Sequence, residues 1–318
     1  MEILVTGATG FVGGRLAPAL STAGHDVRVL VRDADRYDPP EGVEVFEGDL
    51  LAPGSFEEAL AGVDCAYYLV HSMRAGKDFE TRDRTAARSF ARAASDAGVD
   101  RVVYLGGLGE EGEILSDHLR SRREVEGILD DGDYELTVLR AAIIIGKGSV
   151  SFEMIHQLST RLLVMVTPRW VHNECQPIAI DDVVAYLVAA PDIPAGTYEI
   201  GGPDVLTYAE ILRRTAAVAG TRRPLILPVP ILTPQLSSYW VGLVTDVDWR
   251  VARPLIDGLA NPVVVSDDSI TDLVDFDLTP FDGAVEQALG TGSTRDANGQ
   301  PRTRDEDSQS PTQDAPRS

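Results

Sequence analysis

A glycine-rich turn near the start of the chain restricts the fold more than any other feature. The sequence VTGATGFVGGRL, residues 5–16, places Gly7, Gly10 and Gly13 at regular intervals. The apolar run EILVTG leads into the turn, and GGRLAPALSTAGH follows it with the apolar spacing of a helix. This order predicts a strand, a tight turn and a helix whose N-terminal amides can bind a phosphate group.

Strands and helices alternate through the first half of the chain. Further strands are predicted at residues 26–32, 43–50, 64–70, 100–108 and 135–145, and helices at residues 53–63, 78–99 and 118–129, with Ser55 as a cap of the first of these. The strand runs contain few polar positions, as is typical of strands that are buried on both faces. The alternation therefore predicts an α/β protein, a doubly wound parallel sheet of the Rossmann type.

The pattern changes after about residue 150, where prolines become frequent. Helices are still predicted at residues 181–190, capped by Asp181 and Asp182, and at 207–220, with a strand at 196–202. We expect a dinucleotide-binding domain over residues 1–150 and a smaller C-terminal lobe over residues 151–290. The lobe should partly complete the sheet and have no large core of its own. Residues 291–318 are polar, acidic and without apolar periodicity, which predicts a disordered tail.

Acidic residues dominate the charge of the chain. The formal net charge is −22, with 50 Asp and Glu against 28 Lys and Arg. Such a negative field disfavours binding to nucleic acid and to anionic membranes. Lys77 and Lys147 are the only lysines. Acidic surplus with few lysines favours a halophilic origin, and the alternative is an ordinary acidic protein.

Other sequence features argue against several classes of protein. Cys65 and Cys175 are far apart and form no CxxC motif, so neither a metal site nor a disulfide framework is expected. The apolar runs are too short or too interrupted to predict a transmembrane segment, and the predicted strand at the start leaves no room for a signal peptide. These features predict a cytoplasmic protein. They leave the oligomeric state open.

The glycine turn and the predicted strand ends favour a dinucleotide as the ligand. Arg32, at the end of the second predicted strand, is suited to pairing with a 2′-phosphate, which favours NADP(H). Asp33 follows it, so NAD(H) stays possible, and Arg32 could instead be a solvated loop residue. Asp49 is expected near the adenine, with a turn-forming Asp as the alternative. The residues expected to hold the dinucleotide are Gly7, Ala8, Thr9, Gly10, Phe11, Val12, Gly13, Arg32, Asp49, Leu50, Leu69, Val70 and His71.

The motifs together resemble a known family. ILVTGATGFVGGRL, GDL, AYYLVHSM, RVVYLGGLG, LRAAIIIGKGS, QPIAIDDVVAYL and YEIGGPDVLTYAEI follow the order of the atypical, extended-type short-chain dehydrogenase/reductase proteins. The chain is most similar to their NmrA-like and NAD-dependent epimerase/dehydratase-like NAD(P)H-binding branch. That branch includes the NAD(P)-binding accessory subunit of respiratory complex I. The resemblance covers roughly residues 1–215.

The resemblance implies a catalytic set of Asn, Ser or Thr, Tyr and Lys, and this chain departs from it throughout. The four positions correspond to about Asp83, about Gly107, His118 and Arg122. His118 and Arg122 are four residues apart, which places them on one face of a helix. His118 is a candidate proton donor and Arg122 a candidate clamp for the nicotinamide ribose. The alternative is that both are ordinary polar residues on a half-exposed helix.

Two functions of different classes follow. The first is an NAD(P)-dependent oxidoreductase that reduces an unidentified small, rather apolar carbonyl or quinone-like substrate. The second is a non-catalytic NADP(H) binder, either a redox sensor or an accessory or assembly subunit, which the missing Tyr and Lys favour. A nucleotide-sugar epimerase or dehydratase is a weaker third candidate, because that chemistry depends on the same Tyr and Lys.

Overall fold

The computed structural model describes the chain except for residues 72–78, 110–116, 229–244, 247–261 and 292–318. The predicted disordered tail lies outside the described residues except for Thr291.

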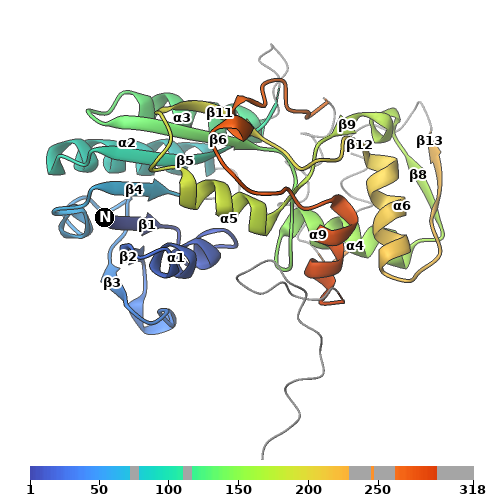
Figure 1. The fold of residues 1–318 in the computed structure, drawn as a ribbon, viewed down its shortest axis with the longest axis horizontal. Coiled ribbons are helices and arrows are strands. Elements are labelled where there is room, and N and C mark those ends of the chain that lie inside the picture. Colours follow the sequence, from blue (N-terminus) through green and yellow to red (C-terminus); the bar gives the residue numbers. More distant parts are fainter. Residues whose placement is uncertain (72–78, 110–116, 229–244, 247–261, 292–318) are drawn as a thin grey trace, which may run out of the picture.

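A seven-stranded sheet forms the centre of the molecule (Figure 1). In sheet order its strands are β11 (Gly196–Ile200), β6 (Glu135–Ala141), β5 (Arg101–Gly107), β4 (Cys65–Tyr68), β1 (Glu2–Thr6), β2 (Asp26–Val31) and β3 (Val43–Glu47). Every neighbouring pair runs parallel. The strand order reverses between β1 and β4, and dinucleotides bind at this kind of position in doubly wound sheets. The predicted α/β fold with a parallel sheet is confirmed.

Helices cover both faces of the sheet (Figure 1). The helices α1 (Gly13–Thr22) and α5 (Ile180–Ala189) pack on one face, and α2 (Phe79–Ala97) and α3 (Asp117–Asp130) pack on the other. Successive side chains of β1 point to opposite faces, so Val5 is buried against the first helix pair and Leu4 against the second. Within the described residues, no helix combines the length and apolar character needed to cross a lipid bilayer.

The second lobe adjoins the carboxyl edge of the sheet, and its described residues include three helices and three short strand pairs. The helices are α4 (Val150–Arg161), α6 (Tyr208–Val218) and α9 (Phe281–Leu289). The pairs are β7 (Ile144–Ile145) with β10 (Ile178–Ala179), β9 (Glu174–Cys175) with β12 (Leu206–Thr207), and β8 (Val164–Thr167) with β13 (Leu225–Pro228). Phe152, Ile211 and Val285 are buried in an apolar cluster of the lobe's own. The expectation that the lobe has no large core is not met, because α6 packs against both α4 and α9.

The segment after β3 differs from the sequence prediction. In place of a helix over residues 53–63, only a 3-10 turn forms, at Glu57–Leu60. The Ser55 hydroxyl accepts a hydrogen bond from the amide of Asp49 and donates one to the carbonyl of Ala52, so it caps no helix. Its hydrogen bonds close the loop that begins at Asp49, which a local helical pattern does not reveal.

Asp182 has a different role from the predicted cap of α5. Ala179 occupies the N-cap position of α5, and its side chain forms no capping hydrogen bond. The buried Asp182 carboxylate instead accepts hydrogen bonds from the backbone amide and the hydroxyl of Thr279, both at 2.8 Å. Burial raises the pKa of Asp182, and the two bonds from Thr279 partly offset that effect. The carboxylate thus links α5 to the segment that leads into α9.

We expect Asp182→Ala to lower the free energy of unfolding by about 1–3 kcal/mol, because two hydrogen bonds to a buried carboxylate are lost and the Thr279 amide is left without its acceptor. Urea denaturation followed by circular dichroism measures the change. Asp181→Ala is the matched control, since Asp181 is exposed and should change the stability by less than about 0.5 kcal/mol. Equal effects of the two substitutions would contradict the assigned role of Asp182.

Candidate functional site

The glycine turn between β1 and α1 leaves no space for side chains at two positions. Gly7 has φ +72°, and a Cβ there would lie 2.7 Å from the carbonyl oxygen of Leu69. A Cβ on Gly13 would lie 2.4 Å from the carbonyl oxygen of Gly7. The amide of Gly10 donates to that same Gly7 oxygen at 2.9 Å and closes the turn. Gly7 thus permits the tight turn, and Gly13 permits close packing of helix and strand.

The outer part of the turn is open to solvent and is held from one side. Thr9 and Gly10 are exposed, whereas Ala8 is buried beneath them. Arg15 donates to the carbonyls of Phe11 and Lys147, at 2.7 and 2.6 Å, and its guanidinium lies over the Phe11 ring. These contacts fix the turn while its crest and the first amides of α1 remain available to an anion. The geometry fits the pyrophosphate of a dinucleotide.

The hydroxyl of Thr6 joins the carboxyl ends of β1 and β4. It donates to the carbonyl of Tyr67 at 2.9 Å and accepts from the amide of Leu69 at 3.2 Å, and Thr6 is fully buried. The chain from Leu69 to His71 is therefore held directly against the glycine turn. This is the position at which Leu69, Val70 and His71 were expected to border the cofactor.

The ends of β2 and β3 carry the two residues expected at the adenosine side. Arg32 is exposed, and its side chain forms no hydrogen bond or ion pair with any described residue. The neighbouring Asp33 carboxylate pairs with the Nε of Arg36 at 3.1 Å. Asp49 Oδ1 accepts from the amide of Leu51 at 2.9 Å, so Asp49 forms a turn, and Leu50 is buried. Arg32 is thus available to bind an anion at this edge of the sheet, because the carboxylate of the neighbouring Asp33 is already paired with Arg36.

Sequence reasoning missed a buried pair beside the turn. His71 Nδ1 and Asp83 Oδ2 lie 2.8 Å apart, with side-chain exposures of 11% and 3%. Burial and then the charge of Arg122 lower the pKa of His71 to about 4, against the opposing effect of Asp83. A neutral imidazole that faces a carboxylate carries its proton on the facing nitrogen, because a carboxylate only accepts. The two residues come from different elements, so no local pattern could have connected them.

Arg122 brings a positive charge to this pair from α3. Its Nη1 donates to the carbonyl of Leu105, near the end of β5, at 3.5 Å, and its own carbonyl accepts from the Tyr104 hydroxyl at 3.3 Å. The structure therefore brings Arg122, His71 and Asp83 to the carboxyl ends of β4 and β5. His118 lies in the first turn of α3, one turn before Arg122, but its side chain is outside the described residues.

The side chain of Leu119 lies over the position that corresponds to the Ser or Thr of the resembled family. A Cβ on Gly107 would lie 2.9 Å from Cδ2 of Leu119, and a Cβ on Gly109 would lie 3.1 Å from Cδ1 of the same leucine. An apolar side chain thus covers the end of β5 where a hydroxyl would hold a carbonyl oxygen. A catalytic site here has to work without that hydroxyl.

Four aromatic or histidine residues of the second lobe, Trp170, His172, Tyr239 and Trp240, are weaker candidates for the substrate side. Trp170 packs edge-on against Tyr208 at 5.9 Å, which is core packing of the second lobe, and His172 is exposed. Tyr239 and Trp240 are outside the described residues. In the part of the chain that the structure describes, no three His, Cys, Asp or Glu side chains are grouped as metal ligands. Cys65 and Cys175 are buried free thiols.

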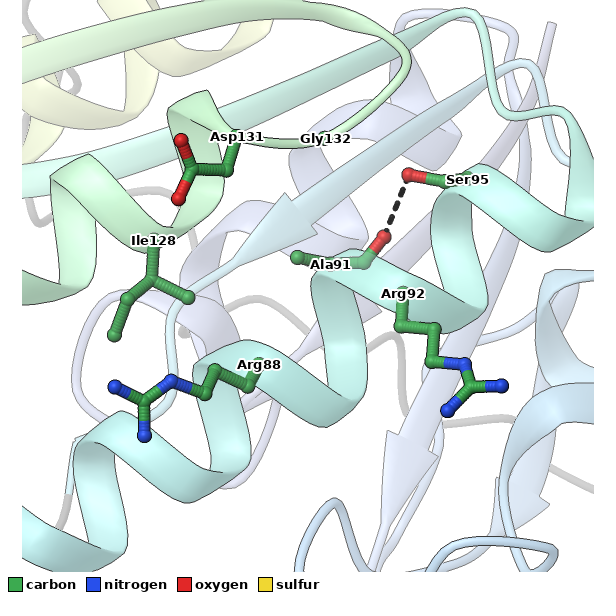
Figure 2. A pocket seen from close by; sticks show the side chains of 7 residues that line it. All are labelled: Arg88, Ala91, Arg92, Ser95, Ile128, Asp131 and Gly132. Carbon is green, nitrogen blue, oxygen red and sulfur yellow. Dashed lines mark hydrogen bonds between the residues drawn. The ribbon is translucent and has the colours of Figure 1, made fainter.

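An open groove of about 370 Å³ lies between the C-terminal halves of α2 and α3 (Figure 2). Arg88, Arg92 and Asp131 line it together with Ala91 and Ile128. Arg92 follows Asp83 by nine residues of helix, which is about 14 Å along the axis. The groove therefore lies away from the glycine turn, and we do not assign the cofactor to it.

Comparison with known proteins agrees with this geometry. Residues 7–155 match the family described as NAD(P)H-binding. The chain is 32% identical to the ceramide reductase of Caulobacter vibrioides over 241 residues, which cover 73% of this chain and 75% of that protein. It is 26% identical over 301 residues to NADH dehydrogenase [ubiquinone] 1 alpha subcomplex subunit 9 of Arabidopsis thaliana, covering 87% and 73%.

Among solved structures, the triphenylmethane reductase of Citrobacter sp. complexed with NADP(H) has the same fold. Its TM-score is 0.71 at 22% identity, with 91% of this chain and all of the other covered. The chain belongs to the NAD(P)H-binding, reductase-like family.

The buried His71 should make the protein sensitive to acid. Its folded pKa of about 4 lies below the ordinary value of 6.5, so between these values the unfolded chain binds more protons than the folded one. The free energy of unfolding should therefore fall as the pH drops from about 6.5 to about 4, by up to about 3 kcal/mol.

His71→Asn keeps a donor toward Asp83 and cannot titrate, so we expect a shallower pH dependence of urea denaturation in that variant. His172→Asn removes an exposed imidazole and leaves His71 in place, so the slope should persist. An unchanged slope in His71→Asn would show that another group causes the acid sensitivity.

Proposed function

We propose that this member of the NAD(P)H-binding family is an NADPH-dependent reductase of a small, apolar carbonyl or quinone-like compound. The observation that carries the proposal is the position of Arg122, whose guanidinium lies at the carboxyl end of β5 and near enough to His71 to lower its pKa. A cation at this position suits the nicotinamide ribose. The relative named as a ceramide reductase supports reduction and an apolar substrate. The predicted cytoplasmic location belongs to the same proposal.

The residues present fit the cofactor. Gly7, Gly10 and Gly13 with the first turn of α1 would hold the pyrophosphate, and Arg32 would pair with the 2′-phosphate. The pairing of Asp33 with Arg36 supports NADP(H) over NAD(H), because a free carboxylate beside Arg32 would repel the phosphate. Asp49 and Leu50 would border the adenine. When bound, the reduced cofactor supplies a hydride to the substrate carbon.

Within this proposal His118 donates a proton to the substrate oxygen as that carbon is reduced. Arg122 cannot perform this step, because its guanidinium stays charged. Its part is to position the ribose, and His118 acts from its protonated, imidazolium form. Leu119 over Gly107 gives the substrate side an apolar wall in place of a hydroxyl.

A second candidate is a non-catalytic NADP(H) binder, either a redox sensor or an accessory subunit. The observation that favours it is the same Leu119 contact, which puts an apolar side chain where the family's catalytic set has a hydroxyl. The similarity to a subunit of the Arabidopsis NADH dehydrogenase also supports it. Both candidates need the glycine turn, so turnover decides between them.

Charge reversal at Arg32 should weaken NADPH binding by about tenfold to a hundredfold and leave NADH binding nearly unchanged, because only the 2′-phosphate pairs with this side chain. Calorimetric titration of Arg32→Glu with each cofactor measures both. Arg92→Glu makes the same charge change at an exposed position on α2 and should bind both cofactors as the wild type does. Parallel losses for NADPH and NADH would contradict the assigned role of Arg32.

The proposed reaction is tested by NADPH oxidation with a panel of apolar aldehydes and quinones. We expect His118→Ala to lower kcat by about a hundredfold or more while the Kd of NADPH stays the same, because only proton transfer is lost. Arg122→Gln should raise the Kd and lower kcat together. Tight NADPH binding with no oxidation in the panel, and no effect of His118→Ala, would favour the sensor or accessory function.

A further inference from the structure

A two-stranded ribbon at the end of the second lobe exposes an apolar face. In the ribbon β8 pairs with β13, with Val164 opposite Leu225 and Val166 opposite Leu227. Met165 and Ile226 point into the lobe and are buried. The opposite face presents Leu163, Val164, Val166, Leu225 and Leu227, each of which is between 44% and 65% exposed. Figure 1 shows β8 and β13 at the outermost end of the molecule, beyond α6.

Large apolar side chains grouped on one exposed face usually mark an interaction site. A surface ribbon ordinarily alternates apolar and polar residues, so that its outer face is polar. This ribbon is apolar on both faces. Its inner face is already covered by the lobe, and its outer face therefore suits a partner with an apolar surface.

Arginines surround the same ribbon. Arg161 precedes β8, and Arg222 and Arg223 precede β13. Because the strands are parallel and in register, these arginines lie at one end of the ribbon. Arg222 and Arg223 are exposed and form no ion pair with a described residue, whereas Arg161 pairs with Asp246. Arg169, exposed, follows β8 at the other end.

This distribution of charge is unusual for the chain. Asp and Glu make up 50 of 318 residues, yet residues 154–173 and 211–245 contain neither. The segments that build the ribbon are thus the positive part of a strongly negative protein. The global charge, which disfavours anionic surfaces, does not describe this end.

We propose that the β8–β13 ribbon docks the protein onto an anionic lipid surface. Arginine pairs with phosphate through two parallel hydrogen bonds, and apolar side chains enter the boundary between headgroups and acyl chains. The ribbon presents both groups together. A second copy of the chain is a poorer occupant, because its ribbon would bring the exposed Arg222 and Arg223 against a surface of like charge. The proposal does not depend on the reductase activity.

Vesicle flotation of the full chain tests the proposal. Vesicles of phosphatidylcholine alone are compared with vesicles of phosphatidylcholine and phosphatidylglycerol, over a series of KCl concentrations at which circular dichroism shows the folded protein. We expect binding to the anionic vesicles only, and weaker binding as KCl increases. No binding of the wild type to anionic vesicles at any of these concentrations would overturn the proposal.

Two double substitutions separate the two components of the surface. Arg222→Glu with Arg223→Glu should weaken binding by at least about tenfold. Val164→Ser with Leu225→Ser should weaken it as well without changing the charge. Leu163→Ser, at the most exposed of these apolar positions, serves if that double variant does not fold. NADPH binding and the thermal midpoint should stay the same in each variant, since the side chains are exposed.

Matched controls lie elsewhere on the molecule. Arg88→Glu with Arg92→Glu repeats the charge change on α2, and Leu273→Ser repeats the apolar change at a residue that is 43% exposed. Both should bind vesicles as the wild type does. Equal losses in the controls and the ribbon variants would overturn the proposal. A wild-type dimer that becomes monomeric in Val164→Ser with Leu225→Ser, with unchanged vesicle binding, would instead assign the ribbon to contact between copies.

Discussion

The close approach of the glycine turn to the end of β4 is the constraint on which the rest of the site depends. Gly7 lies so near the carbonyl of Leu69 that no side chain fits between them, and the Thr6 hydroxyl holds the two strand ends in that relation. The contact is two residues before His71, whose imidazole pairs with Asp83. The same packing brings α1 against the sheet through Gly13. One short sequence thus defines the place for a pyrophosphate and fixes the end of β4 beside it.

Most of the sheet could be predicted from the sequence because each strand is marked locally. β1, β2, β4, β5 and β6 are apolar runs bounded by polar or glycine residues, and that pattern is sufficient. The wrong predictions arise where a local sequence pattern indicates one role for a side chain and a hydrogen bond in the fold gives it another. Ser55 precedes an apparently helical segment, but its hydroxyl bonds to the loop after β3. The sequence position of Asp182 predicts a helix cap, but its carboxylate accepts hydrogen bonds from Thr279. Thr279 lies far along the chain, so no local spacing rule predicts this contact.

The site was predictable to the extent that it consists of consecutive residues. The glycine turn and the strand ends follow from motif and order, whereas the pairing of His71 with Asp83 depends on the packing of α2 against the sheet. The Leu119 contact with Gly107 is similar: the missing hydroxyl is visible in the sequence, but the residue that occupies its place is not. The charge of −22 correctly described the chain as a whole and gave no indication of the arginines around β8 and β13.

The position of β11 in the sheet has a consequence for how such a protein can diversify. β11 comes after α4 and α5 in the chain, yet it pairs with β6 along its full length. Much of the second lobe is therefore an insertion between two adjacent strands of one sheet. The inserted sequence can change in length and shape while both of its ends stay anchored. Removing everything after β6 would instead expose an unpaired strand edge to other chains. A change of length between these two attachment points therefore leaves the hydrogen bonds of the sheet, on which the cofactor turn depends, in place.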